Sequence, residues 1–106
     1  MRQEYQDLAS EEKTIENHLK AGAKRGYVSS MSALFRKLRR TRRISFVGDW
    51  PILSFIIHTA KKQNISFTLS QIKGALRYSK EYKDLGKAEK MRWAVTLYGC
   101  QAETTK

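Results

Sequence analysis

Apolar residues recur along this chain at the spacing of helices rather than strands. The first predicted helix follows an N-cap at Ser10, carries acidic residues in its first turn and ends at Gly22 and Gly26. A second helix is expected to begin near Ser29 or Ser30 and to bury one face. The residues of that face are Met31, Leu34, Phe35 and Leu38.

The middle of the chain predicts a short extended segment and then a buried helix. Residues 44–47 are expected to be extended, and Gly48 and Asp49 to form a turn. Trp50 is expected to be extended as well, because the residue before a proline avoids the helical region. Pro51 suits the first turn of a third helix. The residues of that helix are apolar on almost every face, so it is predicted to be the buried centre of the fold.

The clearest local signal lies in the second half of the chain. Thr68 to Gln71 is a capping box, and Phe67 with Ile72 has the spacing of a hydrophobic staple. This predicts a fourth helix that stops at Gly86 and buries Leu69, Ile72 and Leu76. A fifth helix is predicted over residues 87–98, with Gly99 as its cap. Its inward residues are expected to be Met91, Ala94, Val95 and Tyr98.

These patterns predict a mainly α protein. The expected fold is a single compact domain of four to five short helices, with one short extended segment near residues 44–47. The chain has 106 residues, one proline and no Ser/Gly-rich linker, which leaves room for one modest core and indicates no domain boundary. Residues 1–106 are therefore treated as one domain that ends in a polar tail at residues 100–106.

Positive charge changes this picture from a generic helical domain to a candidate binding protein. The chain has 21 Lys and Arg against 10 Asp and Glu, a net charge of +11. Residues 24–43 contain eight basic residues and no acidic one, and residues 65–92 add a net +4, whereas residues 1–23 are net −2. Such an excess calls for an anionic partner, and nucleic acids and anionic membranes are the usual ones.

The densest basic segment is residues 36–43, where six of eight positions are basic. A solvated helix normally alternates its charges, because like charges one turn apart repel. Arginine predominates here, and its planar guanidinium suits phosphate contacts. We therefore expect contacts to a nucleic-acid backbone, which position the protein without reading sequence. The predicted contact residues are Arg36, Lys37, Arg39, Arg40, Arg42 and Arg43.

A second basic row is expected on the outward face of the fourth helix, at Lys73, Arg77 and Lys80. Tyr78 and Tyr82 lie beside it in the sequence. Basic residues interleaved with aromatic ones are typical of surfaces that bind phosphates and stack on exposed bases. The alternative is that both tyrosines complete the core and leave only their hydroxyls outside.

Residues that could carry catalysis or bind a metal are sparse. His18 and His58 are 40 residues apart, and the single Cys100 can form neither an internal disulfide nor a thiolate zinc site alone. Glu81-Tyr82-Lys83, with Asp49 upstream, is similar to the acidic-x-Lys signature of metal-dependent nucleases, but it falls on a predicted helix and such triplets arise by chance. We predict a protein that is not an enzyme, with no cofactor and no metal.

The location expected from the sequence is cytoplasmic, without a membrane partner. The N-terminus has no apolar signal core. The longest mostly apolar run, residues 52–60, is far shorter than the roughly 20 residues that span a membrane.

Several short motifs in residues 46–104 form a pattern. They are Pro51-Ile52-Leu53, Thr68 to Arg77, Tyr82 with Leu85, Arg92-Trp93 and Leu97-Tyr98-Gly99. This pattern resembles the ProQ/FinO type of RNA-chaperone domain. The resemblance implies a helical domain whose basic concave face holds structured small RNAs at a stem and its 3′ tail. It also implies RNA contacts by Lys73, Arg77, Tyr82 and Arg92.

The sequence favours a non-catalytic RNA-binding protein and leaves other functions open. One is a small helical subunit of a larger nucleoprotein complex, such as a CRISPR effector, that holds a strand of RNA or DNA without reading it. Another is a helix-turn-helix DNA-binding protein with residues 70–82 as the recognition helix. A third is an amphipathic helix over residues 30–43 that lies on a membrane surface or binds a partner.

Overall fold

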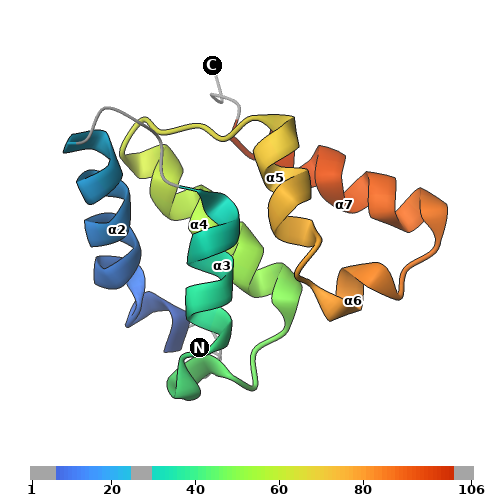
Figure 1. Cartoon of the computed structure of the whole chain (residues 1–106), viewed down its shortest axis with the longest axis horizontal. Coiled ribbons are helices and arrows are strands. Elements are labelled where there is room, and N and C mark those ends of the chain that lie inside the picture. Colours follow the sequence, from blue (N-terminus) through green and yellow to red (C-terminus); the bar gives the residue numbers. More distant parts are fainter. Residues whose placement is uncertain (1–6, 25–29, 102–106) are drawn as a thin grey trace.

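The computed structural model describes residues 7–24 and 30–101, with the side chain of residue 23 left out. A helical stretch at residues 7–9 comes first, and helices then follow one another along the chain (Figure 1). They are α2 (Glu12–Lys24), α3 (Met31–Arg39), the 3-10 helix η1 (Arg42–Ile44), α4 (Asp49–Lys62), α5 (Leu69–Leu76), α6 (Lys80–Lys83) and α7 (Lys87–Gly99). The described residues contain no strand, and the prediction of a mainly α domain is confirmed.

Two helix starts are set by local chemistry that the sequence made visible. Ser30 caps α3, where its hydroxyl accepts a hydrogen bond from the amide of Ala33 at 3.4 Å. Thr68 and Gln71 form the predicted capping box of α5, with hydrogen bonds of 3.1 and 2.8 Å between each side chain and the other residue's amide. These bonds satisfy amides of the first turn that have no partner inside the helix.

The predicted bounds of the first helix were wrong. Ser10 is not the cap of α2, because its hydroxyl donates to the carbonyl of Asp7 at 2.6 Å and the helix begins at Glu12. Gly22 is buried inside α2, which continues to Lys24. A glycine lowers helix propensity by only about 1 kcal/mol, so packing can carry a helix past it. The predicted stop at Gly26 lies outside the described residues.

The predicted extended segment at residues 44–47 was wrong as well. The chain there is a 3-10 turn followed by a second turn, in which the amide of Val47 donates to the carbonyl of Ile44 at 3.0 Å. Both residues are buried, at 0% and 1% exposure. A strand would point residues three apart to opposite faces, whereas successive turns bring both into the core.

Trp50 lies inside α4 rather than in an extended segment before it. Asp49, Trp50 and Pro51 are the first three residues of the helix. Amides of the first helical turn have no intrahelical partner, so the proline removes no hydrogen bond there. The indole of Trp50 packs edge-on against Trp93 at 5.2 Å between ring centroids, which holds Trp50 in this position.

The predicted fourth helix is two helices. The helix α5 ends at Leu76, and Ser79 has an extended backbone and caps the short α6, accepting from the amide of Tyr82 at 3.1 Å. The same hydroxyl donates to a carboxylate oxygen of Asp49 at 2.6 Å. This contact with a residue 30 positions away fixes the break between α5 and α6.

The predicted inward face of α7 was wrong for three of its four residues. Ala94 is buried as expected, but Met91, Val95 and Tyr98 are 68%, 57% and 49% exposed. The face that packs inward carries Trp93, Ala94 and Leu97. Apolar residues occupy two faces of this helix, so its periodicity could not select one.

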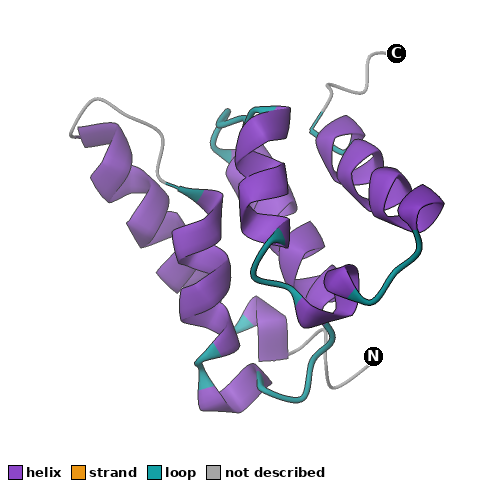
Figure 2. Ribbon diagram, turned by 45° about the vertical axis from the view of Figure 1, so that its right-hand side comes forward, coloured by secondary structure: helices purple, strands orange, loops and turns teal. Residues whose placement is uncertain are grey.

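The helices surround a core in which α4 is the most extensively buried element, as predicted. The helix α4 packs against α2, α3 and α7, and α5 packs between α3 and α7 (Figures 1 and 2). The helix α7 lies at one edge of the molecule in both views. The radius of gyration of 13.4 Å is close to the roughly 13 Å of a compact 100-residue domain. No helix of the described part is long and apolar enough to cross a membrane.

Candidate nucleic-acid interface

The basic segment 36–43 runs from the second half of α3 into η1. The inward stripe of α3 is buried in the core, and this orients the opposite side of the helix toward solvent. Five of the six predicted contact residues have exposed side chains: Arg36, Lys37, Arg40, Arg42 and Arg43. They form one surface, which we call the α3–η1 basic surface.

Little within the described part of the protein neutralises this surface. Among the described residues, no carboxylate lies within ion-pair distance of Arg36, Lys37, Arg40 or Arg42. Arg43 approaches Glu11 at 4.0 Å and donates to the hydroxyl of Ser10 at 3.2 Å, but its side chain is 61% exposed. An exposed pair at that distance contributes little stability.

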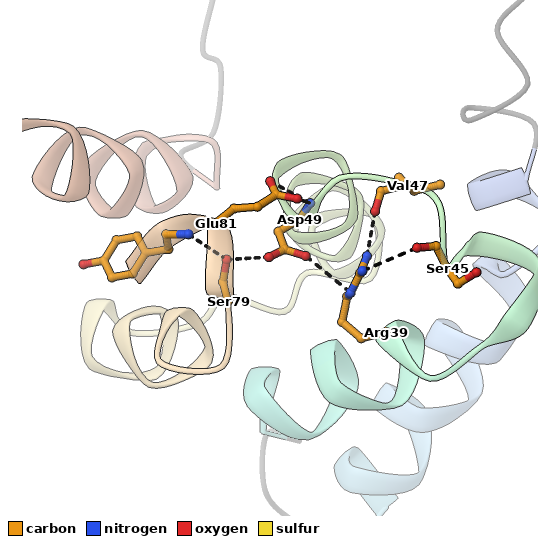
Figure 3. A network of polar contacts seen from close by, with 7 residues as sticks. Arg39, Ser45, Val47, Asp49, Ser79 and Glu81 are labelled. Atoms are coloured by element: carbon orange, nitrogen blue, oxygen red, sulfur yellow. Dashed lines mark hydrogen bonds and ion pairs between the residues drawn. The ribbon is translucent and has the colours of Figure 1, made fainter. Parts of the chain in front are cut away.

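Arg39 is the exception in the segment, because its guanidinium has partners within the protein. Figure 3 shows its guanidinium turned into a polar network between α3, α4 and α6. Its Nε lies 3.3 Å from a carboxylate oxygen of Asp49, and Nη1 donates to the carbonyl of Val47 at 2.6 Å. The Asp49 side chain is only 6% exposed. Arg39 therefore neutralises a buried charge, and its half-buried side chain differs in this from the exposed cations of the segment.

The same network accounts for both carboxylates of the nuclease-like pattern. Asp49 is bonded to Arg39 and Ser79, and the carboxylate of Glu81 accepts from the amide of Asp49 at 3.2 Å (Figure 3). Glu81 thus caps the start of α4. Within residues 7–24 and 30–101, no group of three or more His, Cys, Asp or Glu side chains is placed to hold a metal ion.

Lys73 and Arg77 of the second basic row lie on and directly after α5, which packs next to α3 and therefore beside the α3–η1 basic surface. The helices α3 and α5 lie side by side, and the guanidinium of Arg36 stands 4.6 Å from the ring centroid of Tyr78. Tyr78 is 52% exposed and follows directly on Arg77. A cation–π contact of this kind orients an arginine at a surface while leaving its hydrogen-bond donors free. The basic surface therefore continues from α3 across Tyr78 onto α5.

The outward face of α5 is hollowed around a glycine. A shallow depression of about 530 Å³ is lined by Leu69, Ser70, Lys73, Gly74 and Arg77. A Cβ atom added at Gly74 would meet nothing within 4 Å, so the space above it is open. Lys73 and Arg77, which both line this hollow, are exposed. The arrangement presents two cations one turn apart with room for a close approach between them.

The remaining predicted site residues lie elsewhere. Lys80 is exposed at the start of α6, beyond the break in the helix, and does not continue the row of α5. Tyr82 is half-buried, with its ring centroid 6.0 Å from that of Trp93 and the ammonium of Lys90 5.8 Å away. Arg92 pairs with Glu89 at 2.9 Å on α7. The stretch from Arg92 to Gly99 is helical.

Sequence reasoning missed two features. The first is the contact between Arg36 and Tyr78, which are 42 residues apart and share no sequence signal. The second is the exposed apolar face of α7, where apolar residues were assigned to the core.

The fold and the site together define a small helical protein with one strongly basic face. No protein-family model, no curated protein and no solved structure matches the chain.

Proposed function

We propose that this protein is a non-catalytic nucleic-acid-binding protein that holds RNA through phosphate contacts from the α3–η1 basic surface. One observation carries the proposal: Arg36, Lys37, Arg40 and Arg42 are exposed within seven residues and have no carboxylate partner among the described residues. Uncompensated like charges at this density are unfavourable unless an anion covers them. A polyphosphate backbone supplies that anion and releases its counterions on binding.

The arrangement around α5 does not suit insertion of this helix into the major groove of DNA. A recognition helix presents its N-terminal residues to base edges in the groove. Here the start of α5 is tied to the end of α7, because the side chain of Gln101 bonds both the amide and the carbonyl of Phe67. The helix is also only eight residues long, and α3 and α7 flank it. These features disfavour the helix-turn-helix alternative.

A second candidate function is that of a subunit in a larger nucleoprotein complex. The exposed apolar residues of α7, Met91, Val95 and Tyr98, favour it. A contiguous apolar patch on the surface is typical of a site that contacts another protein. In that setting the basic surface holds the strand, and partner subunits provide the specificity.

Salt-titrated binding of the purified protein to three probes tests the proposal. The probes are a hairpin RNA with a 3′ tail, an unstructured single-stranded RNA and a DNA duplex. Four uncompensated cations predict a slope of log K against log salt of about −3 on a single strand. Preference for the hairpin at physiological salt supports the RNA-chaperone type of function. Equal binding to all three probes supports the subunit, and absence of salt-dependent binding contradicts both.

A further inference from the structure

An apolar groove runs between α5 and α7, next to the hollow on α5, with which it shares Leu69 and Lys73. It encloses about 360 Å³ and is lined by Leu69, Lys73, Tyr82, Lys87, Lys90, Met91, Ala94 and Val95. Five of these eight side chains are apolar or aromatic, and none is acidic. At the other end of α7, Tyr98 lines a smaller hollow of about 220 Å³ beside Phe67.

The α7 residues Met91 and Val95 that line the groove belong to a longer stripe of exposed apolar side chains. Met91, Val95 and Tyr98 recur at the i, i+4, i+7 spacing of one helix face, and they are among the most exposed large apolar residues of the described chain. Seven residues of helix span about 10 Å, or two turns. This is the length over which an amphipathic helix places its anchors when it docks in a groove.

The rim of the groove is positively charged. Lys73, Lys87 and Lys90 line it, and none of the three lies within ion-pair distance of a carboxylate among the described residues. An occupant of the groove lies close to these ammonium groups, because all three lysines line it. Acidic residues beside its apolar face would pair with them, whereas basic residues there would be repelled.

From this geometry we propose that the groove between α5 and α7 docks an acidic amphipathic helix of a partner protein. The apolar face of that helix covers Met91 and Val95, and its flanking Glu or Asp side chains pair with Lys87 and Lys90. A second copy of this chain is the less suitable occupant, because its net charge of +11 would bring like charges together. The apolar lining likewise favours a protein over a nucleic-acid backbone. This docking stands whether or not the α3–η1 surface binds RNA.

A defined probe tests the proposal: a synthetic helical peptide with Leu at i, i+4 and i+7 and Glu at the neighbouring positions, measured by fluorescence anisotropy. We expect the full chain to bind it and the M91Q/V95Q variant to bind at least about tenfold more weakly. Gln favours helix and these side chains are exposed, so the fold is retained. The matched control is Phe46→Gln, which removes an exposed apolar side chain outside the groove and leaves binding unchanged.

Charge exchange separates docking from non-specific attraction. Lys87→Glu should weaken binding of the Glu peptide, and a peptide with Lys in place of Glu should bind that variant better than it binds the original chain. Equal binding of the peptide to the original chain and to M91Q/V95Q would overturn the proposal. So would a dimer of the chain that M91Q/V95Q abolishes, or a loss of single-stranded RNA binding in that variant, because the occupant would then be a second copy or a nucleic acid.

Discussion

Two arginines adjacent in the sequence, Arg39 and Arg40, should behave in opposite ways when each is replaced by alanine. Arg39 reaches into the network around Asp49, whereas the side chain of Arg40 is exposed at the end of α3. We expect R39A to destabilise the fold and to leave nucleic-acid binding largely intact. We expect R40A to weaken binding and to leave the fold intact.

The loss of stability expected for R39A follows from the Asp49 carboxylate, which the substitution leaves buried without its ion-pair partner. Removing one partner of a buried ion pair costs about 3–5 kcal/mol, because the other charge stays buried without compensation. Two features lower this figure here. The side chain of Arg39 is 32% exposed, and Asp49 keeps the hydroxyl of Ser79 at 2.6 Å and its favourable place in the first turn of α4. About 2–3 kcal/mol remains, which for a domain of this size lowers Tm by roughly 10–20 °C.

The assay pairs urea unfolding, followed by circular dichroism, with salt-titrated RNA binding for both variants. The free energy of unfolding of R40A should lie within about 0.5 kcal/mol of that of the original chain, because substitutions of exposed side chains have small effects. It should also flatten the salt slope by about 0.7 on a single strand. The reasoning is refuted if R39A and R40A are equally stable. It is also refuted if folded R39A flattens the salt slope as much as R40A does, since Arg39 would then contact phosphate.

Three further substitutions test local features by urea unfolding. Thr68→Ala removes the cap of α5 and should destabilise the fold by about 1 kcal/mol; an unchanged midpoint would mean that the capping box contributes nothing. Gly74→Ala should stabilise it by about 0.5–1 kcal/mol, because the added methyl meets open space and lowers the entropy of the unfolded chain; destabilisation would show a contact at that position. Thr59→Val replaces a fully buried hydroxyl that has no hydrogen-bond partner among the described residues, and it should stabilise the fold by about 1 kcal/mol; a loss of stability would reveal a partner for that hydroxyl.

Features encoded by neighbouring residues could be predicted from the sequence. The capping box at Thr68 and the buried stripe of α3 depend on contacts within about one helical turn, and both are present as expected. The mainly α fold follows from the same local periodicity. The basic segment was also evident, because charge density along a helix requires no knowledge of the tertiary structure.

Features that depend on distant residues could not be predicted. The break between α5 and α6 is held by the bond from Ser79 to Asp49, and no sequence spacing reveals that bond. The same network distinguishes Arg39 from Arg40, which are chemically identical in the sequence. On α7, apolar residues occupy two faces, and the inward side is determined by the packing of Trp93 against Trp50 on α4, which the sequence does not reveal.

The central claim is that the α3–η1 basic surface, and not net charge alone, holds the nucleic acid. The most direct test compares the salt slopes of single-stranded RNA binding for two double variants that each lose two positive charges. R40A/R42A lies on the surface, and K20A/K24A removes two exposed lysines of α2. The account predicts that R40A/R42A flattens the slope by about 1.4 and that K20A/K24A leaves it nearly unchanged. Equal slopes for the two variants would contradict the claim.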